Sequence, residues 1–237
     1  MCVILICPPK VRPDLATLEA CHNANSHGAG IAWRSGGRVH FRKTDEVAEI
    51  HRLAKAAKGQ VVIHFRIASI GAVCPELRHP FPVTNRAGLS DSGNAKAVLF
   101  QNGTWCGWQD AVAKAVRDGH DEPAGPMSDA RAAAWLTHVY GVEYLTALRP
   151  SRWVLFGAEE TVIHGEWRER GGIQFSNLHW CGRDTGIPPH LISRPSTKPK
   201  PVKQGSGTRA NPLRVNLWGD QTDYWSRIAG TSTTGRK

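Results

Sequence analysis

Apolar residues in this chain occur mostly in short runs, which polar segments containing glycine or proline separate. Runs rich in β-branched and aromatic residues predict strands at residues 3–6, 61–65, 97–100, 153–156, 161–164 and 172–175. Two further runs, 31–33 and 39–41, flank a Ser-Gly-Gly-Arg turn and predict a hairpin. Pro8 and Pro9 end the first strand, because proline cannot donate a ladder hydrogen bond.

Other stretches have the spacing of a helix face. Apolar residues three and four apart predict helices that begin near Thr44 or Asp45, near Trp108 and after Ser128, and a shorter helix covers residues 14–20. Polar or glycine-rich segments at 22–30, 69–79 and 118–126 predict loops. The order of strands, helix, strands, helices and strands predicts an α+β fold, with helices over antiparallel sheets.

The composition is that of a folded protein of ordinary size. With 237 residues, of which 41% are hydrophobic, the chain can bury a sizeable core. It has no apolar run of about eighteen residues, so the sequence predicts no transmembrane helix and no membrane contact. The apolar run at residues 3–6 is too short for the core of a signal peptide. We therefore expect a cytoplasmic protein.

Charge is distributed unevenly along the chain. The formal net charge is +10, and residues 190–237 contain nine lysines and arginines and two aspartates, a net charge of +7. Residues from about 188 to 207 are rich in proline, serine, lysine and glycine, which is typical of a linker. We expect a globular domain at residues 1–187 and an extended basic linker and tail at residues 188–237. The tail predicts at most a weak contact with a polyanion.

The cysteines give no sign of a disulfide framework or a metal site. The six cysteines are Cys2, Cys7, Cys21, Cys74, Cys106 and Cys181. None belongs to a C-x-x-C pair, and disulfides are rare in cytoplasmic chains of this size. Cys21, His22 and His27 lack the paired spacing of a structural zinc site. The sequence therefore predicts no metal and no cofactor.

Cys2 could act as an N-terminal nucleophile, because it directly follows the initiator methionine. If Met1 is removed, Cys2 carries both a thiol and an α-amine whose pKa is about 7.7–8.0. A neutral amine can act as general base for an adjacent nucleophile. The strand that follows would hold this nucleophile at the end of a sheet. Taken alone, Cys2 also fits a small residue at the start of an edge strand.

Three later positions supply the groups that hydrolysis of a carboxamide requires. Asn102 and Gly103 form a turn after a strand, and the amide side chain and backbone N–H can donate to a developing oxyanion. Arg66, at the end of a strand, can bind the α-carboxylate of a free amino acid through its planar fork. Asp129, at a predicted helix start, can bind the α-ammonium group. Taken singly, each also fits a structural role: a turn, a strand-end charge or a helix N-terminus.

In chain order, Cys2, Arg66, Asn102-Gly103 and Asp129 form a pattern. This pattern resembles the glutamine amidotransferase domain of class II, a branch of the N-terminal-nucleophile hydrolases. The resemblance covers roughly residues 2–180. The segment His-Gly-Ala-Gly-Ile-Ala at 27–32 is similar to the family's H-G-x-G-x-A, and His-Phe-Arg-Ile-Ala-Ser-Ile-Gly at 64–71 is similar to H-x-R-x-A-T-x-G. His79 precedes a proline at the family's spacing, thirteen residues after Arg66. Gln-Asn-Gly at 101–103 and Ser-Asp-Ala-Arg at 128–131 match H-N-G and S-D-(T/S)-E.

The resemblance implies a four-layer αββα sandwich of two antiparallel sheets, and it implies roles for seven residues. Cys2, Asn102 and Gly103 would be catalytic, and Arg66, Ser69, His79 and Asp129 would bind the substrate. The chain departs from the family pattern in five places: at Val3, Ser69, Ile70, Leu77-Arg78 and Gln101. Ser69 keeps the hydroxyl of the usual threonine. The changed loop before His79 bears on substrate choice.

The leading functional expectation is a stand-alone glutamine amidotransferase. It would hydrolyse glutamine to glutamate and ammonia through a thioester on Cys2, and pass the ammonia to a separate synthase subunit, since no second domain is visible after Cys181. One alternative is an amidase of the same nucleophile type that acts on another amide or a small peptide. A second alternative is a non-catalytic, nucleic-acid-associated module that binds through its basic tail.

Overall fold

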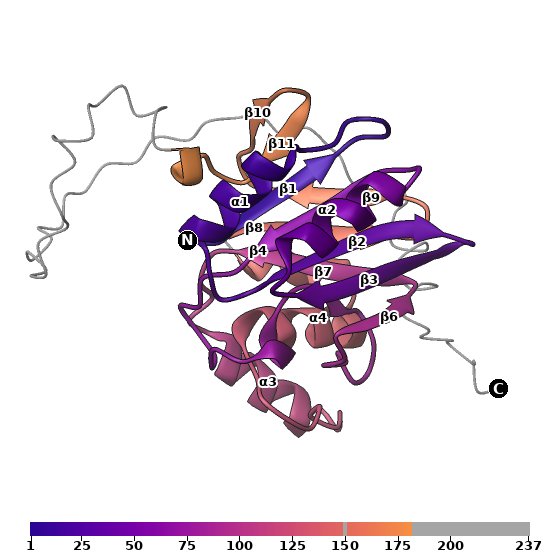
Figure 1. Cartoon of the computed structure of the whole chain (residues 1–237). Coiled ribbons are helices and arrows are strands. Elements are labelled where there is room, and N and C mark those ends of the chain that lie inside the picture. The colour runs from indigo at the N-terminus through magenta and orange to yellow at the C-terminus, as the bar shows by residue number, and fades with distance from the viewer. Residues whose placement is uncertain (149–150, 182–237) are drawn as a thin grey trace, which may run out of the picture.

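Two antiparallel sheets form the centre of the protein (Figure 1). The computed structural model describes residues 1–148 and 151–181, so the predicted linker and tail lie outside the described residues. The strands of the seven-stranded sheet are, in spatial order, β10 (Arg168–Arg170), β11 (Ile173–Phe175), β1 (Val3–Cys7), β4 (Val61–Phe65), β2 (Ala29–Ser35), β3 (Arg38–Thr44) and β6 (Ser92–Ala95). The strands of the four-stranded sheet are β5 (Phe81–Pro82), β7 (Ala97–Asn102), β8 (Arg152–Gly157) and β9 (Thr161–His164).

Four α-helices are described, and they lie on the outer faces of the sheets. α1 (Leu15–Ala24) and α2 (Val47–Ala56) cross the seven-stranded sheet in Figure 1, whereas α3 (Trp108–Arg117) and α4 (Asp129–Tyr140) lie at the opposite side, below it. Short 3₁₀ helices are formed by Pro75–Leu77, Val142–Leu148 and His179–Cys181. The predicted α+β class with two antiparallel sheets is confirmed.

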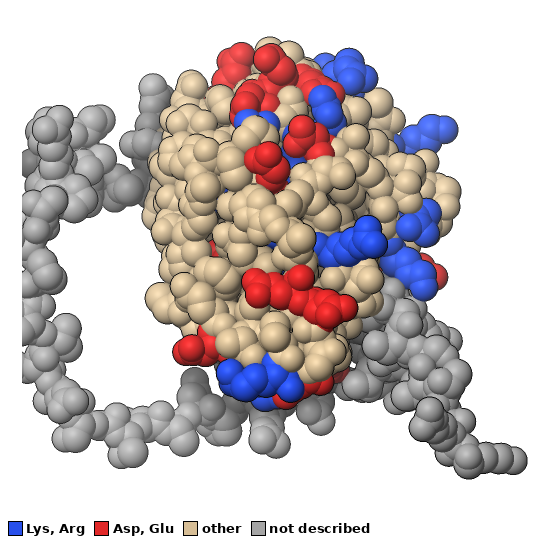
Figure 2. Space-filling view, turned by 90° about the horizontal axis from the view of Figure 1, so that it is seen from below, with Lys and Arg blue, Asp and Glu red and all other residues tan. Residues whose placement is uncertain are grey.

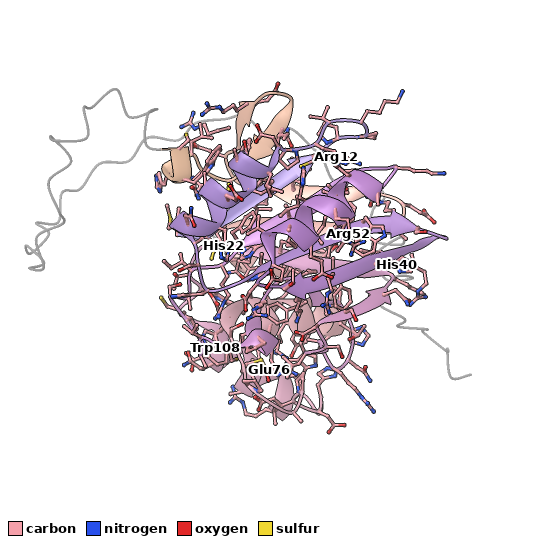
Figure 3. All side chains as sticks on the ribbon, viewed as in Figure 1. Arg12, His22, His40, Arg52, Glu76 and Trp108 are labelled. Carbon is pink, nitrogen blue, oxygen red and sulfur yellow. The ribbon has the colours of Figure 1, made fainter. Side chains whose placement is uncertain are left out.

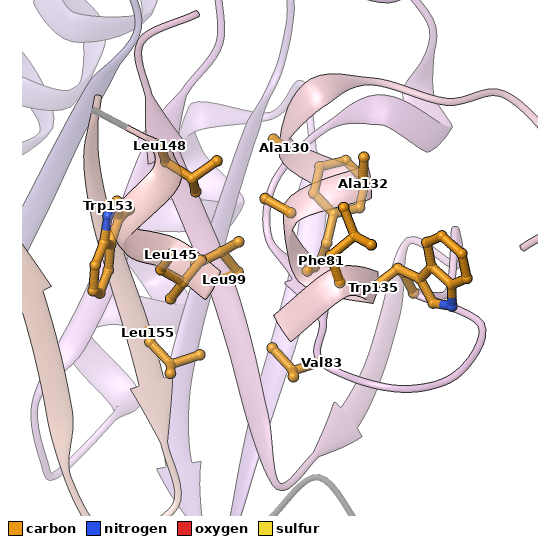
Figure 4. Close-up of a cluster of buried hydrophobic side chains, with 14 of the residues drawn as sticks. Phe81, Val83, Leu99, Ala130, Ala132, Trp135, Leu145, Leu148, Trp153 and Leu155 are labelled. Atoms are coloured by element: carbon orange, nitrogen blue, oxygen red, sulfur yellow. The ribbon is translucent and has the colours of Figure 1, made fainter. Parts of the chain in front are cut away.

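Three clusters of buried side chains hold these elements together. Alternate residues of β1 belong to different clusters: Val3 and Leu5 pack with α1 and α2, whereas Ile4 and Ile6 pack toward β7 and β8. The third cluster lies between the four-stranded sheet and α4, and includes Phe81, Leu99, Trp135, Trp153 and Leu155 (Figure 4). β1 and β4 are therefore buried on both faces, which explains why β1 is apolar throughout and β4 is apolar except for His64.

Local chemistry accounts for several element boundaries. Gly36 and Gly37 both have positive φ, as a two-residue hairpin turn between β2 and β3 requires. Ser128 caps α4 by accepting the Arg131 N–H at 3.2 Å, as predicted. Arg12, near α2 in Figure 3, donates to the carbonyls of Ala54 and Ala57 and so satisfies the C-terminal end of that helix.

Some predicted boundaries were wrong. α1 continues through residues 22–24, which were expected to be a loop, because Leu18 and Cys21 bury one helix face against the sheet. The N-cap of α2 is Glu46, and Thr44 instead accepts the Glu46 N–H at 3.1 Å. β6 and β10 were not predicted, because their residues are mostly polar and exposed. Both strands occupy sheet edges, where backbone pairing alone positions them.

The surface of the described part carries both signs of charge. On the face seen from below in Figure 2, groups of acidic side chains lie amid uncharged surface, and the basic side chains gather toward one side. No helix among residues 1–148 and 151–181 is long and apolar enough to cross a membrane.

Candidate active site

Cys2 lies directly before β1, at the edge where β1 begins and β4 ends. The antiparallel register pairs Val3 with Phe65, so the residues that follow β4 lie beside Cys2. The Cys2 thiol donates to the Ile67 carbonyl at 3.3 Å, and its sulfur accepts the Ile67 N–H at 3.4 Å. The Asn177 side chain donates to the Cys2 carbonyl at 2.6 Å. Cys2 is thus fixed on both sides by backbone and side-chain contacts.

The electrostatics of the thiol are balanced between burial and nearby positive charge. Burial raises the pKa of the Cys2 thiol above its ordinary value, while the Ile67 N–H, the N-terminal charge and the Arg66 guanidinium act in the opposite direction. Each of the opposing groups stabilises a thiolate. A base close to the sulfur would still be required to keep a useful fraction of thiolate at neutral pH.

Arg66 is buried at the same edge and is tied to the loop that follows it. Its N–H donates to the Gly28 carbonyl at 2.8 Å, which extends the pairing of β4 with β2. Its guanidinium donates to the carbonyls of Ala72 at 2.9 Å and Ile70 at 3.3 Å. A buried guanidinium held by only these two side-chain contacts keeps further donors available for an anionic group.

Asn102 and Gly103 end β7, next to the start of β1. Asn102 is the last residue of the strand, two residues beyond its predicted end, and its side-chain N–H₂ donates to the Ser176 hydroxyl at 2.8 Å. Gly103 has a φ of 153°, and a Cβ there would lie 2.3 Å from the Ser151 hydroxyl oxygen. Only glycine can therefore make this turn beside the following strand.

Asp129 is the first residue of α4, and its carboxylate points back toward β7. It accepts the Trp105 N–H at 2.9 Å and the Gln101 amide at 3.3 Å. Burial raises the pKa of the Asp129 carboxyl, while the Trp105 hydrogen bond and the charge of Arg66 act in the opposite direction. The contact with Gln101 gives a role to the position where the family pattern has histidine.

Ser69 and His79 complete the predicted set. The Ser69 hydroxyl lies 3.0 Å from the Thr104 hydroxyl, which joins the loop after β4 to the loop after β7. His79 is 5% exposed and packs against His64, with ring centroids 4.0 Å apart. Burial holds the pKa of His79 well below its usual range and lowers the pKa of His64 to about 3, so both rings are neutral at pH 7.

The structure brings all seven predicted residues around Cys2, in two adjoining hollows. The first, which we call the inner cavity, has a volume of about 20 Å³ and is lined by residues that include Cys2, Arg66, Ser69, His79, Gly103 and Asp129. The second, which we call the Cys2 pocket, has a volume of about 530 Å³ and is lined by residues that include Met1, Cys2, Ser69, Asn102, Gly103 and Arg152. Cys2, Ser69 and Gly103 belong to both.

The sequence did not indicate several residues that support this arrangement. Ser176 and Asn177 follow the short strand β11. They are distant in sequence from Asn102 and Cys2, yet Ser176 contacts Asn102 and Asn177 contacts Cys2. His27, which belongs to the motif at 27–32 but was given no role from the sequence, accepts the Ala68 N–H on its Nδ1 at 2.9 Å. Only the motif at 27–32 gave a signal for one of these residues. Within the described ranges, no group of three His, Cys, Asp or Glu side chains could hold a metal ion.

Comparison with known proteins supports the fold. No family model matches the sequence, and no curated protein matches it. Among solved structures, a glutamine phosphoribosylpyrophosphate amidotransferase from B. subtilis, complexed with ADP and GMP, matches 74% of this chain with 15% identity and a TM-score of 0.50. A structure described as the allosteric regulatory enzyme of purine biosynthesis matches the same share with 15% identity and a TM-score of 0.51.

The fold is similar to that of a class II glutamine amidotransferase, of the N-terminal-nucleophile type. The chain spans 41% of the length of each of these two proteins. The likeness thus concerns one part of a larger enzyme, and at this identity it concerns the fold alone. It agrees with the resemblance carried by the sequence motifs.

Proposed function

We propose that this protein is a glutamine amidotransferase or glutaminase that hydrolyses the γ-carboxamide of glutamine through a thioester on Cys2. One observation carries the proposal: Cys2, Arg66, Gly103 and Asp129 line a single cavity. A nucleophile, an oxyanion donor and two opposite charges for an amino acid therefore converge on one place. The packing of α1 and α2, the two sheets and α4 also supports the four-layer αββα order.

In this proposal the nucleophile is completed by the loss of Met1. Met1 is 63% exposed and lines the Cys2 pocket, so removing it opens the site and leaves the α-amine beside the thiol. The amine accepts the thiol proton as the sulfur attacks the γ-carbonyl carbon. This proximity compensates for the raised pKa of the thiol, because the proton need not leave for bulk water.

Asn102 and Gly103 stabilise the oxyanion that forms during the attack. The Asn102 amide has two N–H groups, and one of them donates to Ser176, which fixes the plane of the amide. The second N–H and the Gly103 backbone N–H are the proposed oxyanion donors. One such donor typically contributes about 3–4 kcal/mol to the stabilisation of the transition state.

Arg66 and Asp129 select a free amino acid in this proposal. Arg66 binds the α-carboxylate and Asp129 the α-ammonium group. The inner cavity, at about 20 Å³, has room for about one water molecule, which is far less than glutamine needs. Glutamine therefore requires the loop at residues 67–78 to move, so that its carboxylate reaches the Arg66 donors that the Ile70 and Ala72 carbonyls leave available.

We further propose that the protein acts in the cytoplasm together with a separate synthase subunit. The ammonia would then pass to a separate acceptor protein.

Measuring glutamate release from glutamine tests this function. Wild type should release glutamate and ammonia in equal amounts, and Cys2→Ala should release none. Cys106→Ala is the matched control, because Cys106 is an exposed cysteine outside both hollows and its loss should leave the rate unchanged. Undiminished glutamate release by Cys2→Ala would refute the proposal.

A further inference from the structure

A third hollow adjoins the Cys2 pocket on the side away from Arg66 and Asp129. We call it the outer groove; it has a volume of about 470 Å³ and its lining includes Met1, Arg152, Glu166, Arg168, Asn177 and His179. It shares Met1 and Arg152 with the Cys2 pocket. It shares no residue with the inner cavity. The three hollows therefore follow one another, with Cys2 between the inner cavity and the outer groove.

Met1 separates the Cys2 pocket from the outer groove. It is exposed and lines both, so its removal would widen the opening between them, which Arg152 also lines. If the inner cavity holds the γ-glutamyl group, the departing amine faces this groove. Ammonia, the leaving group when glutamine is hydrolysed, needs only about the volume of one water, roughly 30 Å³. The Cys2 pocket and the outer groove, at about 530 Å³ and 470 Å³, are each in the range of small-molecule sites.

The walls of the outer groove carry more positive than negative charge. Arg152 and Arg168 line it together with one acid, Glu166. The Arg152 Nε donates to the Glu166 carbonyl at 2.8 Å, which holds the guanidinium at the boundary between the two hollows. Asn177 connects the groove to the nucleophile through its hydrogen bond to the Cys2 carbonyl. A carboxylate is the group that two guanidinium side chains favour.

We propose that the outer groove binds the amine portion of a γ-glutamyl amide whose amine carries a carboxylate, a γ-glutamyl amino acid. This inference rests on the proposed function and extends it from glutamine to N-substituted γ-amides. The Cys2 sulfur bonds to the γ-carbonyl carbon, the C–N bond breaks, and the amine departs with the proton that the thiol gave up. Water then cleaves the thioester, which yields glutamate and restores the thiol.

The test compares two substrates that differ only in charge: γ-glutamylglycine and γ-glutamylglycinamide. Wild type should hydrolyse the acid with a kcat/KM roughly three- to tenfold above that of the amide, because partly exposed charge pairs contribute modestly. Arg168→Gln and Arg152→Gln should each lower this ratio, and the double variant should bring it close to one. Arg117→Gln, on α3 and outside all three hollows, is the matched control and should keep the wild-type ratio.

Glutamate release from glutamine in the same preparations separates the two proposals. If wild type hydrolyses glutamine but has equal kcat/KM for γ-glutamylglycine and γ-glutamylglycinamide, only the proposal for the outer groove is overturned. A ratio that both arginine variants leave unchanged would do the same. Failure to hydrolyse glutamine or either dipeptide would overturn the proposed function, and this inference with it.

Discussion

The two hollows on either side of Cys2 are built in opposite ways. The inner cavity has a volume of about 20 Å³ and places charged groups of Arg66 and Asp129 in buried positions, each held by backbone contacts. The outer groove has a volume of about 470 Å³, and its Arg168 is an exposed residue on an edge strand. Buried charges impose strict selection, since each unpaired one is costly. Exposed charges give a graded preference that solvent and salt reduce.

The largest effect is expected at the turn that closes the inner cavity. Gly103→Ala would place a Cβ 2.3 Å from the Ser151 hydroxyl oxygen at a φ of 153°. The turn must shift, and the proposed oxyanion donors shift with it. We expect kcat on glutamine to fall roughly 100- to 1,000-fold, as for loss of an oxyanion donor. Gly59→Ala is the control, because nothing lies within 4 Å of the added Cβ; an active Gly103→Ala enzyme would rule out this role for the turn.

The next effect sharpens the selectivity of the inner cavity. Asp129→Asn keeps an acceptor for the Trp105 N–H but removes the charge that is proposed to bind the α-ammonium group. Losing a charged hydrogen bond of about 2–3 kcal/mol predicts a rise in the KM for glutamine of roughly 30- to 150-fold, with a smaller change in kcat. Arg66→Lys should behave similarly, since an ammonium group cannot reproduce the planar fork.

Asp110→Asn provides the matched control for Asp129→Asn. Asp110 also lies in the first turn of a helix, α3, but lines none of the three hollows. Steady-state kinetics on glutamine and on N-acetylglutamine, which has no α-ammonium group, distinguish the two positions. An unchanged KM for glutamine in Asp129→Asn would argue for an amidase that reads other groups.

Desolvation behind the inner cavity predicts a dependence of stability on pH. Burial lowers the pKa of His64 to about 3 in the folded protein, whereas the unfolded chain takes up this proton near pH 6.5. The contribution of neutral His64 to the free energy of unfolding is therefore fully present above about pH 6.5, and it is lost as the pH falls toward 3. By pH 5 the loss is about 2 kcal/mol, and His79 adds to it in the same direction.

Urea unfolding between pH 5 and pH 7.5 measures this loss. His51→Asn is the control, because His51 is a histidine of α2 that is only partly buried. Equal free energies of unfolding at pH 5 and pH 7.5 would show that the two buried rings do not resist protonation.

The smallest effect is expected where the inner cavity meets the Cys2 pocket. Ser69→Ala removes a hydroxyl that is exposed and bonded to the Thr104 hydroxyl. A net hydrogen bond of roughly 1 kcal/mol predicts about a fivefold loss in kcat/KM for glutamine. Ser90→Ala, an exposed serine outside the hollows, should show no loss. A 100-fold loss in Ser69→Ala would mean that the hydroxyl contacts the reacting atoms.

The same contrast explains how much of the site could be predicted from the sequence. The inner cavity is built at the ends of strands that are buried on both faces, and such strands appear as apolar runs. β4, apolar except for His64, leads to Arg66, and the apolar residues 97–100 of β7 lead to Gln101 and Asn102. Ser128 is a recognisable N-cap, so the sequence also indicated that Asp129 is the first residue of α4. Each of these residues follows a strong local signal.

The outer groove left no such signal. β10 is polar and exposed, and Ser176 and Asn177 follow a three-residue strand whose position depends on pairing with β1. Such contacts join residues that are more than 70 positions apart, as from Asn102 to Ser176, and no local spacing encodes them. Gln101 was identified only as a departure from a motif, and its bond to Asp129 becomes visible only in three dimensions.

Mass analysis of the N-terminal peptide, after incubation with a diazo-ketone analogue of glutamine, tests the central claim most directly. The account predicts that Met1 is absent, that one molecule of the analogue is bound to Cys2, and that excess glutamine prevents the labelling. Retention of Met1 in labelled, active protein would contradict the α-amine mechanism. Labelling of Cys106 with Cys2 unmodified would contradict the assignment of the nucleophile.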